Sequence, residues 1–121
     1  MEKSEIKELN RLWQEVIHAR DRYCQICYRQ DGLAGHHIFT RSRKNTCWDL
    51  ENGIGLCYSC HCGSSLLSAH KTPRNFFRWL ENKKGKKWVN DLEIRSQMTA
   101  RYLDAKLIKI YLTQELKKYG I

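Results

Sequence analysis

The sequence predicts a mainly helical α+β protein in which a small cysteine-rich core lies between N-terminal and C-terminal helices. Apolar residues recur at helical spacing near both ends of the 121-residue chain. Two C-x-x-C pairs, Cys24/Cys27 and Cys57/Cys60, bracket a stretch that is rich in turns and in short apolar runs. Because no repeat, low-complexity tract or proline-rich linker divides the chain, we expect residues 1–121 to form a single domain.

The first expected element is an amphipathic helix over about residues 4–20. Ser4 is the expected capping residue at its start. The apolar positions that follow have helical spacing: Ile6, Leu9, Trp13, Val16 and Ile17. The helix leads directly into the first cysteine pair.

The central core is expected over about residues 23–71. Its apolar segments 37–39 and 53–56 are the expected strands. A further helix is expected to begin near the second cysteine pair and to run through Ser64 toward His70.

The C-terminal helices are expected over about residues 73–119. Thr72 supplies a capping hydroxyl and Pro73 follows it in the first turn, which is typical of a helix start. Gly85 should end or interrupt this helix, and the later apolar spacing predicts one or two more helices. The apolar face of the helix that begins at Pro73 is expected at Phe76, Phe77 and Leu80.

The charge balance favours a polyanionic partner. The chain has 22 Lys plus Arg against 13 Asp plus Glu, a formal charge of +9, and a sequence pI of about 9.4. Nucleic acid fits this balance best, and acidic membrane surfaces come second. No apolar run approaches the roughly 20 residues of a membrane span, and the N-terminus lacks the apolar core of a signal peptide. We therefore expect a cytoplasmic protein without a membrane partner.

The two C-x-x-C pairs predict a structural zinc ion held by Cys24, Cys27, Cys57 and Cys60. Each tight turn presents two sulfurs on one side, and folding would bring the two pairs together. Disulfides or plain buried thiols are the alternatives. The other two cysteines are expected to be small core residues, although Cys62 lies beside His61.

Between the pairs lies HHIFTRSRKNTCWDLENGIGLCYSCH, with His36 and His37 adjacent and with Asn52 and His61 downstream. This pattern resembles the HNH endonuclease superfamily, whose active site is a ββα-metal finger and whose members often carry a treble-clef-like zinc site made of four cysteines. The segment LCYSCH matches the form in which the second cysteine pair runs into the helix. The stretch from WDLENG to AHKTP is also similar to small phage-associated HNH proteins, which implies a phage-encoded origin.

The resemblance implies a role for each of these residues. His36 matches the first metal ligand, and His61 matches the second. His37 matches the general base that takes a proton from the attacking water. Asn52 matches the residue that braces the turn between the strands and orients the base. One divalent ion would stabilise charge on the phosphate and on the leaving oxygen, and the products would carry 5′-phosphate and 3′-hydroxyl ends.

The sequence departs from the family pattern at two places. His36 stands where many members have Asp, and imidazole favours Mn²⁺ or Ni²⁺ as the catalytic metal, with Mg²⁺ still usable. Where some members place a third histidine, this chain has Ser65. His70 would reach the metal if the helix ended early, and would otherwise cap the helix or contact phosphate.

Basic residues near the motif are the expected DNA contacts. Arg41, Arg43 and Lys44 follow the first expected strand, where a substrate phosphate would lie. The segment 71–88 carries seven basic residues against one acidic residue, and a solvated basic face is the alternative explanation. Its expected backbone contacts include Lys71, Arg74 and Arg78.

Taken together, the sequence predicts a metal-dependent DNA endonuclease that nicks or cleaves with low sequence specificity. It would act as a monomer or a weak dimer and hold DNA mainly through the phosphate backbone. The alternative is a non-catalytic treble-clef zinc module that binds nucleic acid or protein, and a similar RNA nuclease is a third interpretation. His37 separates the first two, because a binding module has no use for a base beside a metal ligand.

Overall fold

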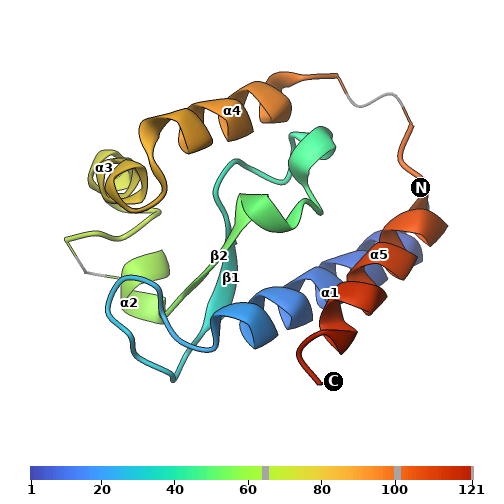
Figure 1. Ribbon diagram of the computed structural model, residues 1–121, viewed down its shortest axis with the longest axis horizontal. Coiled ribbons are helices and arrows are strands. Elements are labelled where there is room, and N and C mark those ends of the chain that lie inside the picture. Colours follow the sequence, from blue (N-terminus) through green and yellow to red (C-terminus); the bar gives the residue numbers. More distant parts are fainter. Residues whose placement is uncertain (64–65, 100–101, 121) are drawn as a thin grey trace.

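The computed structural model describes residues 1–63, 66–99 and 102–120. Its elements in chain order are α1 (Lys3–Asp21), β1 (Ala34–His37), η1 (Lys44–Thr46), η2 (Leu50–Asn52), β2 (Gly53–Leu56), α2 (Tyr58–His61), α3 (Pro73–Lys84), α4 (Lys86–Gln97) and α5 (Ala105–Lys117). Figure 1 shows the small sheet at the centre, with α1 and α5 on one side of it and α2, α3 and α4 toward the other. The predicted class, mainly helical α+β, is confirmed. None of the described helices is both long enough and apolar enough to cross a membrane.

The sheet is one antiparallel pair in which His36 lies opposite Ile54 and His37 lies opposite Gly53. Successive side chains of a strand point to opposite faces. His36 accordingly contacts Phe76 of α3, with ring centroids 5.4 Å apart. The ring of His37 instead stacks on Trp13 of α1 at a centroid distance of 3.8 Å. The two adjacent histidines therefore belong to different faces of the sheet.

Helix α1 covers the glycine-rich face of the sheet and satisfies its free backbone groups. The Gln14 amide accepts from the N–H of Gly35 (2.8 Å) and donates to its carbonyl (2.9 Å). Arg20 donates to the carbonyl of Gly53 (2.8 Å). The Asp21 carboxylate accepts from the N–H of Gly55 (2.7 Å). A two-stranded sheet of this length is marginal by itself, so α1 supplies the partner groups that it lacks.

Two hydrophobic clusters flank the sheet. One joins α1 and α5 to the segment that precedes β2, with Trp13, Val16, Ile17 and Leu112 fully buried. The other lies on the His36 side and centres on Phe76, Leu80 and Leu92 of α3 and α4. It also contains apolar residues of β2 and of the segment that follows β1, and three of the paired cysteines.

Several expected boundaries need correction. Helix α1 begins at Lys3 with Glu2 at the N-cap position, not Ser4. The Glu5 carboxylate accepts from the Glu2 backbone N–H (2.9 Å). The first strand lies at 34–37 and not at 37–39, whereas the second lies at 53–56 as expected.

The expected helix from the second cysteine pair toward His70 is also wrong, because α2 ends at His61. The carbonyls of Cys60 and His61 accept from the N–H groups of Ala69 (2.8 Å) and His70 (2.9 Å), so a returning loop takes over these carbonyls. Gly63 permits this ending, because a Cβ there would lie 2.7 Å from the Cα of Ser59. Ser64 and Ser65 lie outside the described residues.

Thr72 does precede a helix with proline in its first turn, but its hydroxyl makes no cap bond to α3. It donates instead to the carbonyls of Leu66 (2.9 Å) and Ser68 (3.0 Å), within the returning loop. Gly85, at φ 97°, ends α3 and precedes α4, as the sequence predicts. After Gly85 the described residues form two helices, α4 and α5, which is within the one or two that the sequence predicts.

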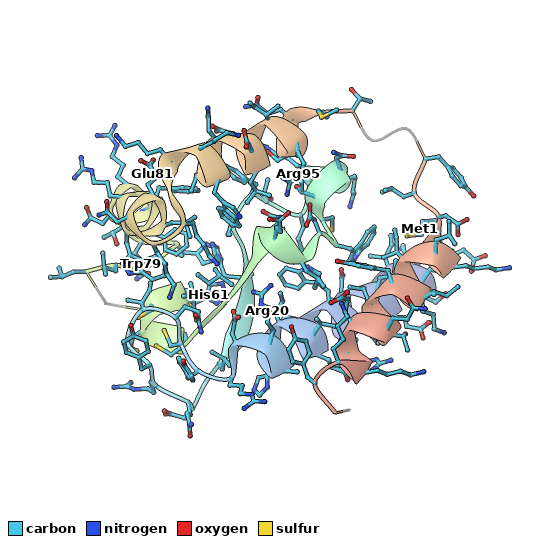
Figure 2. All side chains as sticks on the ribbon, in the orientation of Figure 1. Met1, Arg20, His61, Trp79, Glu81 and Arg95 are labelled. Atoms are coloured by element: carbon cyan, nitrogen blue, oxygen red, sulfur yellow. The ribbon has the colours of Figure 1, made fainter. Side chains whose placement is uncertain are left out.

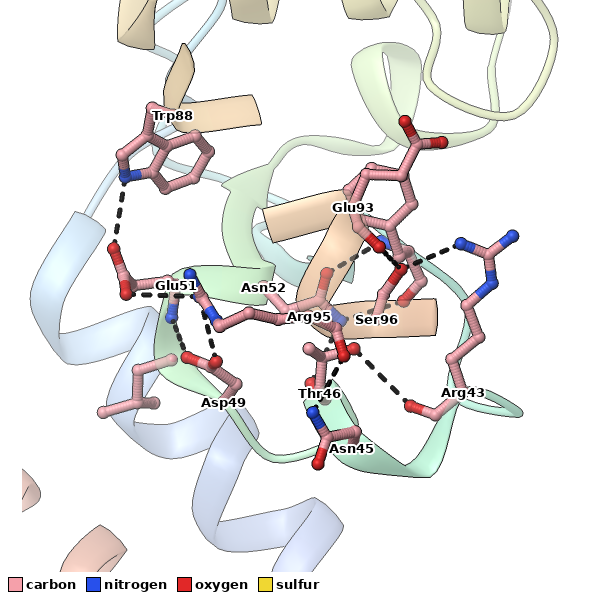
Figure 3. A network of polar contacts seen from close by, with 12 residues as sticks. Arg43, Asn45, Thr46, Asp49, Glu51, Asn52, Trp88, Glu93, Arg95 and Ser96 are labelled. Atoms are coloured by element: carbon pink, nitrogen blue, oxygen red, sulfur yellow. Dashed lines mark hydrogen bonds and ion pairs between the residues drawn. The ribbon is translucent and has the colours of Figure 1, made fainter. Parts of the chain in front are cut away.

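Helix α4 is tied to the segment between the strands by a polar network (Figure 3). Arg95 pairs with Asp49 (3.1 Å) and with Glu51 (3.3 Å). The Asn45 amide donates to the carbonyl of Arg95 (2.8 Å). These contacts hold the 43–52 segment against α4, opposite the side on which α1 contacts it.

Replacing Leu112 by Ala should lower the free energy of unfolding by about 2–5 kcal/mol, because it opens a cavity between α5 and α1. Leu107→Ala on the same helix is the matched control, since Leu107 is 64% exposed and its loss should cost less than about 0.5 kcal/mol. Urea denaturation of the metal-loaded protein measures both values. Equal values for the two variants would mean that α5 does not pack on α1 as described.

Candidate functional site

Four cysteines meet at the end of the molecule that carries α2. The sulfurs of Cys24, Cys27, Cys57 and Cys60 lie within 4.8 Å of one another, and the Cys27 and Cys57 sulfurs are 3.5 Å apart. Figure 2 shows sulfur atoms gathered beside α2, near the labelled His61. Four thiolates at this spacing could hold a metal ion, and they fit the tetrahedral preference of zinc.

The local backbone shapes both cysteine pairs. Tyr28 donates its N–H to the carbonyl of Cys24 (2.9 Å) and adopts a left-handed conformation at φ 66°, which closes the first turn. Cys57 occupies the N-cap position of α2 and Cys60 lies within it. Burial acts to raise the pKa of Cys24, but backbone donors from Cys27, Cys57 and Ile26 outweigh it and lower that pKa to about 7. Hydrogen-bond donors that favour a thiolate also favour metal binding.

Three histidines form a second cluster. His36, His61 and His70 each offer a ring nitrogen, and these atoms lie within 4.8 Å of one another. The Nε2 atoms of His61 and His70 are 3.1 Å apart. At that distance either one ring donates to the other or both direct lone pairs at a shared cation.

The returning loop explains how His70 reaches the other two histidines. Its backbone pairs with the last turn of α2 through the bonds to Cys60 and His61 described above. The buried hydroxyl of Ser68 adds contacts to the His61 carbonyl (3.4 Å) and the Lys71 N–H (3.3 Å). The early helix end that would bring His70 back is therefore present. Ser65, the family position of a third histidine, lies outside the described residues.

Burial favours the neutral form of His36 and His61. His36 is 8% exposed, and burial, followed by the nearby His61 and His70, lowers its pKa to about 3. Burial and then His70 also lower the pKa of His61. A neutral imidazole carries the lone pair that a metal ion needs.

His37 is held by two contacts on the other face of the sheet. Its ring is nearly parallel to the indole of Trp13, with an interplanar angle of 8°. Its Nε2 lies 2.9 Å from the carbonyl oxygen of Cys47, which can only accept, so Nε2 carries the hydrogen. Burial lowers the pKa of His37 to about 4, although the bond to Cys47 acts in the opposite direction. The neutral ring therefore keeps its lone pair on Nδ1.

His36 and His37 belong to different faces of the sheet, but both border one open depression of about 600 Å³. His61, His70 and Arg41 border the same depression, and Gln14 and Phe77 form parts of its wall. The three-histidine cluster, a neutral imidazole and a guanidinium are thus brought to one solvent-accessible site.

Asn52 braces the segment between the strands and is fully buried. Its Oδ1 accepts from the N–H of Phe39 (2.8 Å), and its Nδ2 donates to the carbonyls of Phe39 (2.9 Å) and Thr46 (3.1 Å). Thr46 precedes Cys47, whose carbonyl holds His37. Any influence of Asn52 on the orientation of His37 therefore passes through this backbone.

The basic residues lie in several places. Arg41 borders the histidine depression. Arg43 donates to the Ser96 hydroxyl (2.8 Å) beneath α4, and Lys44 borders a separate hollow near Trp48. Lys71 just before α3, and Arg74 and Arg78 on it, are exposed. Of the three residues expected beside the phosphate, Arg41 borders the depression. Arg43 and Lys44 lie away from it, at α4 and at the hollow near Trp48.

Three groups at this site, the Trp13 ring, the Gln14 amide and the Cys47 carbonyl, were not expected from the sequence. Trp13 has the pattern of an ordinary core position of a helix, and a carbonyl has no sequence signature. The glycines of 53–56 were the available signal, because glycine in a strand often marks a close approach of another element. Comparison of the chain with protein-family models, with curated proteins and with solved structures found no significant match.

Cys60→Ser should greatly weaken metal binding at the tetracysteine cluster, because it removes one of four thiolates. In the wild type, a metal ion present at about 1,000 times its Kd and bound to the native state alone would add about 4 kcal/mol to the free energy of unfolding. Cys60→Ser should lose this stabilisation. Cobalt titration followed by thiolate absorbance, together with thermal melts, measures both effects. Cys62→Ser is the control, and an equal loss of cobalt absorbance in that variant would contradict the assignment of ligands.

Proposed function

We propose that this protein is a metal-dependent DNA endonuclease of the HNH type, which hydrolyses phosphodiester bonds with one divalent ion. One observation carries the proposal: three imidazoles at metal-ligand spacing and the neutral ring of His37 border the same open depression. The HNH-like order of His36, His37, Asn52 and His61 in the sequence adds to it. The strand pair and α2 would form the ββα-metal finger, and the tetracysteine cluster would hold a zinc ion in a treble-clef-like arrangement.

The catalytic ion would be held by His36, His61 and His70. When bound, it would act as a Lewis acid that stabilises negative charge on the phosphate and on the leaving oxygen. An all-imidazole donor set favours Mn²⁺, Ni²⁺, Co²⁺ or Zn²⁺ over Mg²⁺, which prefers oxygen ligands. We therefore expect higher activity with Mn²⁺ or Ni²⁺ than with Mg²⁺.

His37 would act as the general base through Nδ1, the nitrogen that its bond to Cys47 leaves free. It takes a proton from water as the water oxygen bonds to phosphorus. The bond between phosphorus and the 3′ oxygen breaks, and that oxygen leaves with the bonding electrons and takes a proton from solvent water. The products are a 5′-phosphate and a 3′-hydroxyl. A negatively charged phosphate beside the ring favours the imidazolium, which would raise the low pKa of His37 as substrate binds.

DNA would be held through its phosphates. Arg41 borders the depression and would contact the phosphate nearest the scissile bond. The exposed Arg74 and Arg78, with Lys71, would contact phosphates further along one strand. Such contacts carry no sequence information, so we expect low specificity. One site in a monomer would nick one strand at a time.

The competing function is a non-catalytic zinc module that binds nucleic acid or protein. The contacts of His37 are what favour it, since a histidine that is stacked on an indole and bonded to a carbonyl could serve packing alone. The experiment must therefore separate loss of a base from loss of a structural residue.

His37→Ala should lower the rate of plasmid nicking in Mn²⁺ by roughly 10²–10⁴-fold, the usual contribution of a general base. Conversion of supercoiled to open-circular plasmid under single-turnover conditions measures the rate. His18→Ala is the matched control, because His18 is an exposed histidine of α1.

Melting temperature and zinc content, measured for both variants, show whether the fold persists. Intact plasmid after incubation of the wild type with several metals would contradict the nuclease function. Equal rates for His37→Ala and the wild type would contradict the role of His37. A clear preference for Mg²⁺ over Mn²⁺ would contradict the all-histidine metal site.

Replacing Arg74 and Arg78 together by Gln should weaken DNA binding uniformly across sequences. If each arginine neutralises one phosphate, the slope of log K against log salt concentration should become shallower by about 2. Lys106→Gln with Lys117→Gln removes the same charge from exposed positions of α5 and is the control. Fluorescence anisotropy at several salt concentrations measures both slopes, and equal changes would place the DNA elsewhere.

A further inference from the structure

Trp13 lies on α1 where this helix contacts His37, outside the stretch that resembles the HNH motif. The side chain is fully buried. Its indole N–H donates to the carbonyl of Asp49 (3.2 Å), and its ring lies flat against His37 at 3.8 Å. The indole therefore touches both the proposed base and the segment whose Cys47 carbonyl orients that base.

The close fit depends on glycine in the neighbouring strand. Gly53 lies opposite His37 in the register, and a Cβ at Gly53 would lie 2.5 Å from the indole Cζ2. A Cβ at Gly35 would likewise lie 3.0 Å from Cζ3. A Cβ at Gly53 would also lie 2.6 Å from Cδ1 of Ile17, so the close packing of both Trp13 and Ile17 of α1 requires glycine at this position.

The geometry leaves His37 little freedom. Rotation of its ring about the Cβ–Cγ bond would break the bond from Nε2 to Cys47 and would drive the ring edge into the indole face. The stack and the carbonyl bond thus fix one ring plane and one tautomer. With Nε2 protonated and one ring face covered, proton transfer is confined to Nδ1.

We propose that Trp13 is a positioning residue for the proposed nuclease reaction: its indole holds the imidazole of His37 in the orientation and tautomer that a general base requires. This inference rests on the proposed function. Among the described residues, His37 lines the depression and Trp13 does not, so Trp13 would act through His37. Its loss should lower the rate of the chemical step and leave metal binding at the histidine cluster unchanged.

The test compares Trp13→Leu, Trp13→Phe and Trp48→Leu. Phe keeps an aromatic face for the stack, whereas Leu removes it. Trp48 is the matched control, because it is buried in the same hydrophobic cluster and its indole donates to the Asn10 side chain (2.9 Å). Trp13→Leu should reduce the single-turnover rate in saturating Mn²⁺ by roughly tenfold to hundredfold, a part of the about 10²–10⁴-fold that a general base supplies. Trp13→Phe should recover most of that loss, and Trp48→Leu should retain the wild-type rate.

A second readout does not depend on cleavage. In the zinc-loaded protein the ring protons of His37 should be shifted upfield in NMR spectra by the indole ring current. They should move downfield in Trp13→Leu and stay near their wild-type positions in Trp48→Leu.

The two readouts separate failure of the positioning role from failure of the proposed function. Unchanged His37 resonances in Trp13→Leu would overturn the stack itself. Equal cleavage rates for Trp13→Leu and Trp48→Leu, with an active wild type, would overturn the positioning role alone. A wild type that shows the shifted resonances but cleaves no DNA would overturn the proposed function, and the positioning role with it.

Discussion

The close approach of α1 to a two-stranded sheet is the constraint on which the rest of the structure depends. Each strand is only four residues long, and backbone groups of Gly35, Gly53 and Gly55 would lack partners without the helix. Side chains of Gln14, Arg20 and Asp21 provide those partners. The approach is close because glycine presents no Cβ at these positions. A small sheet is thereby held by side-chain hydrogen bonds along a single helix rather than by more strands.

The same constraint separates the adjacent residues His36 and His37. A strand directs neighbouring side chains to opposite faces, so His36 meets the cluster formed by α2, α3 and the returning loop, whereas His37 meets α1. One face supplies three imidazoles at ligand spacing. The other face supplies a stacked, hydrogen-bonded ring whose remaining lone pair is on Nδ1. Because the strand end opens into one depression, both faces serve a single site. The tetracysteine cluster contributes to the same arrangement, since Cys60 directly precedes His61 in α2.

The sequence predicted correctly those features that depend on residue type and local spacing. Cysteine spacing predicted the four-thiol cluster, helical periodicity predicted α1, and the glycine at position 85 predicted the break between α3 and α4. It failed where tertiary contacts decide: α2 stops at His61 because the carbonyls of Cys60 and His61 bond to Ala69 and His70, which local propensity does not encode. That failure affected the site most, because the early stop is what brings His70 to His36. Trp13 was unrecognisable as a partner of His37, since a stack between a helix and a strand appears only once both are placed. The roles of metal, base and DNA contacts remain predictions that the geometry supports.

The proposed function requires that His36, His61 and His70 form a metal site separate from the cysteine cluster. Isothermal titration of Ni²⁺ into protein whose cysteine cluster is already filled with zinc tests it directly. We expect one further site per chain, lost in His36→Ala and retained in His18→Ala, with the zinc content unchanged in both. If the wild type takes up no Ni²⁺ beyond its zinc, or if His36→Ala binds Ni²⁺ as tightly as the wild type, the three histidines do not form a metal site and the proposed function is contradicted.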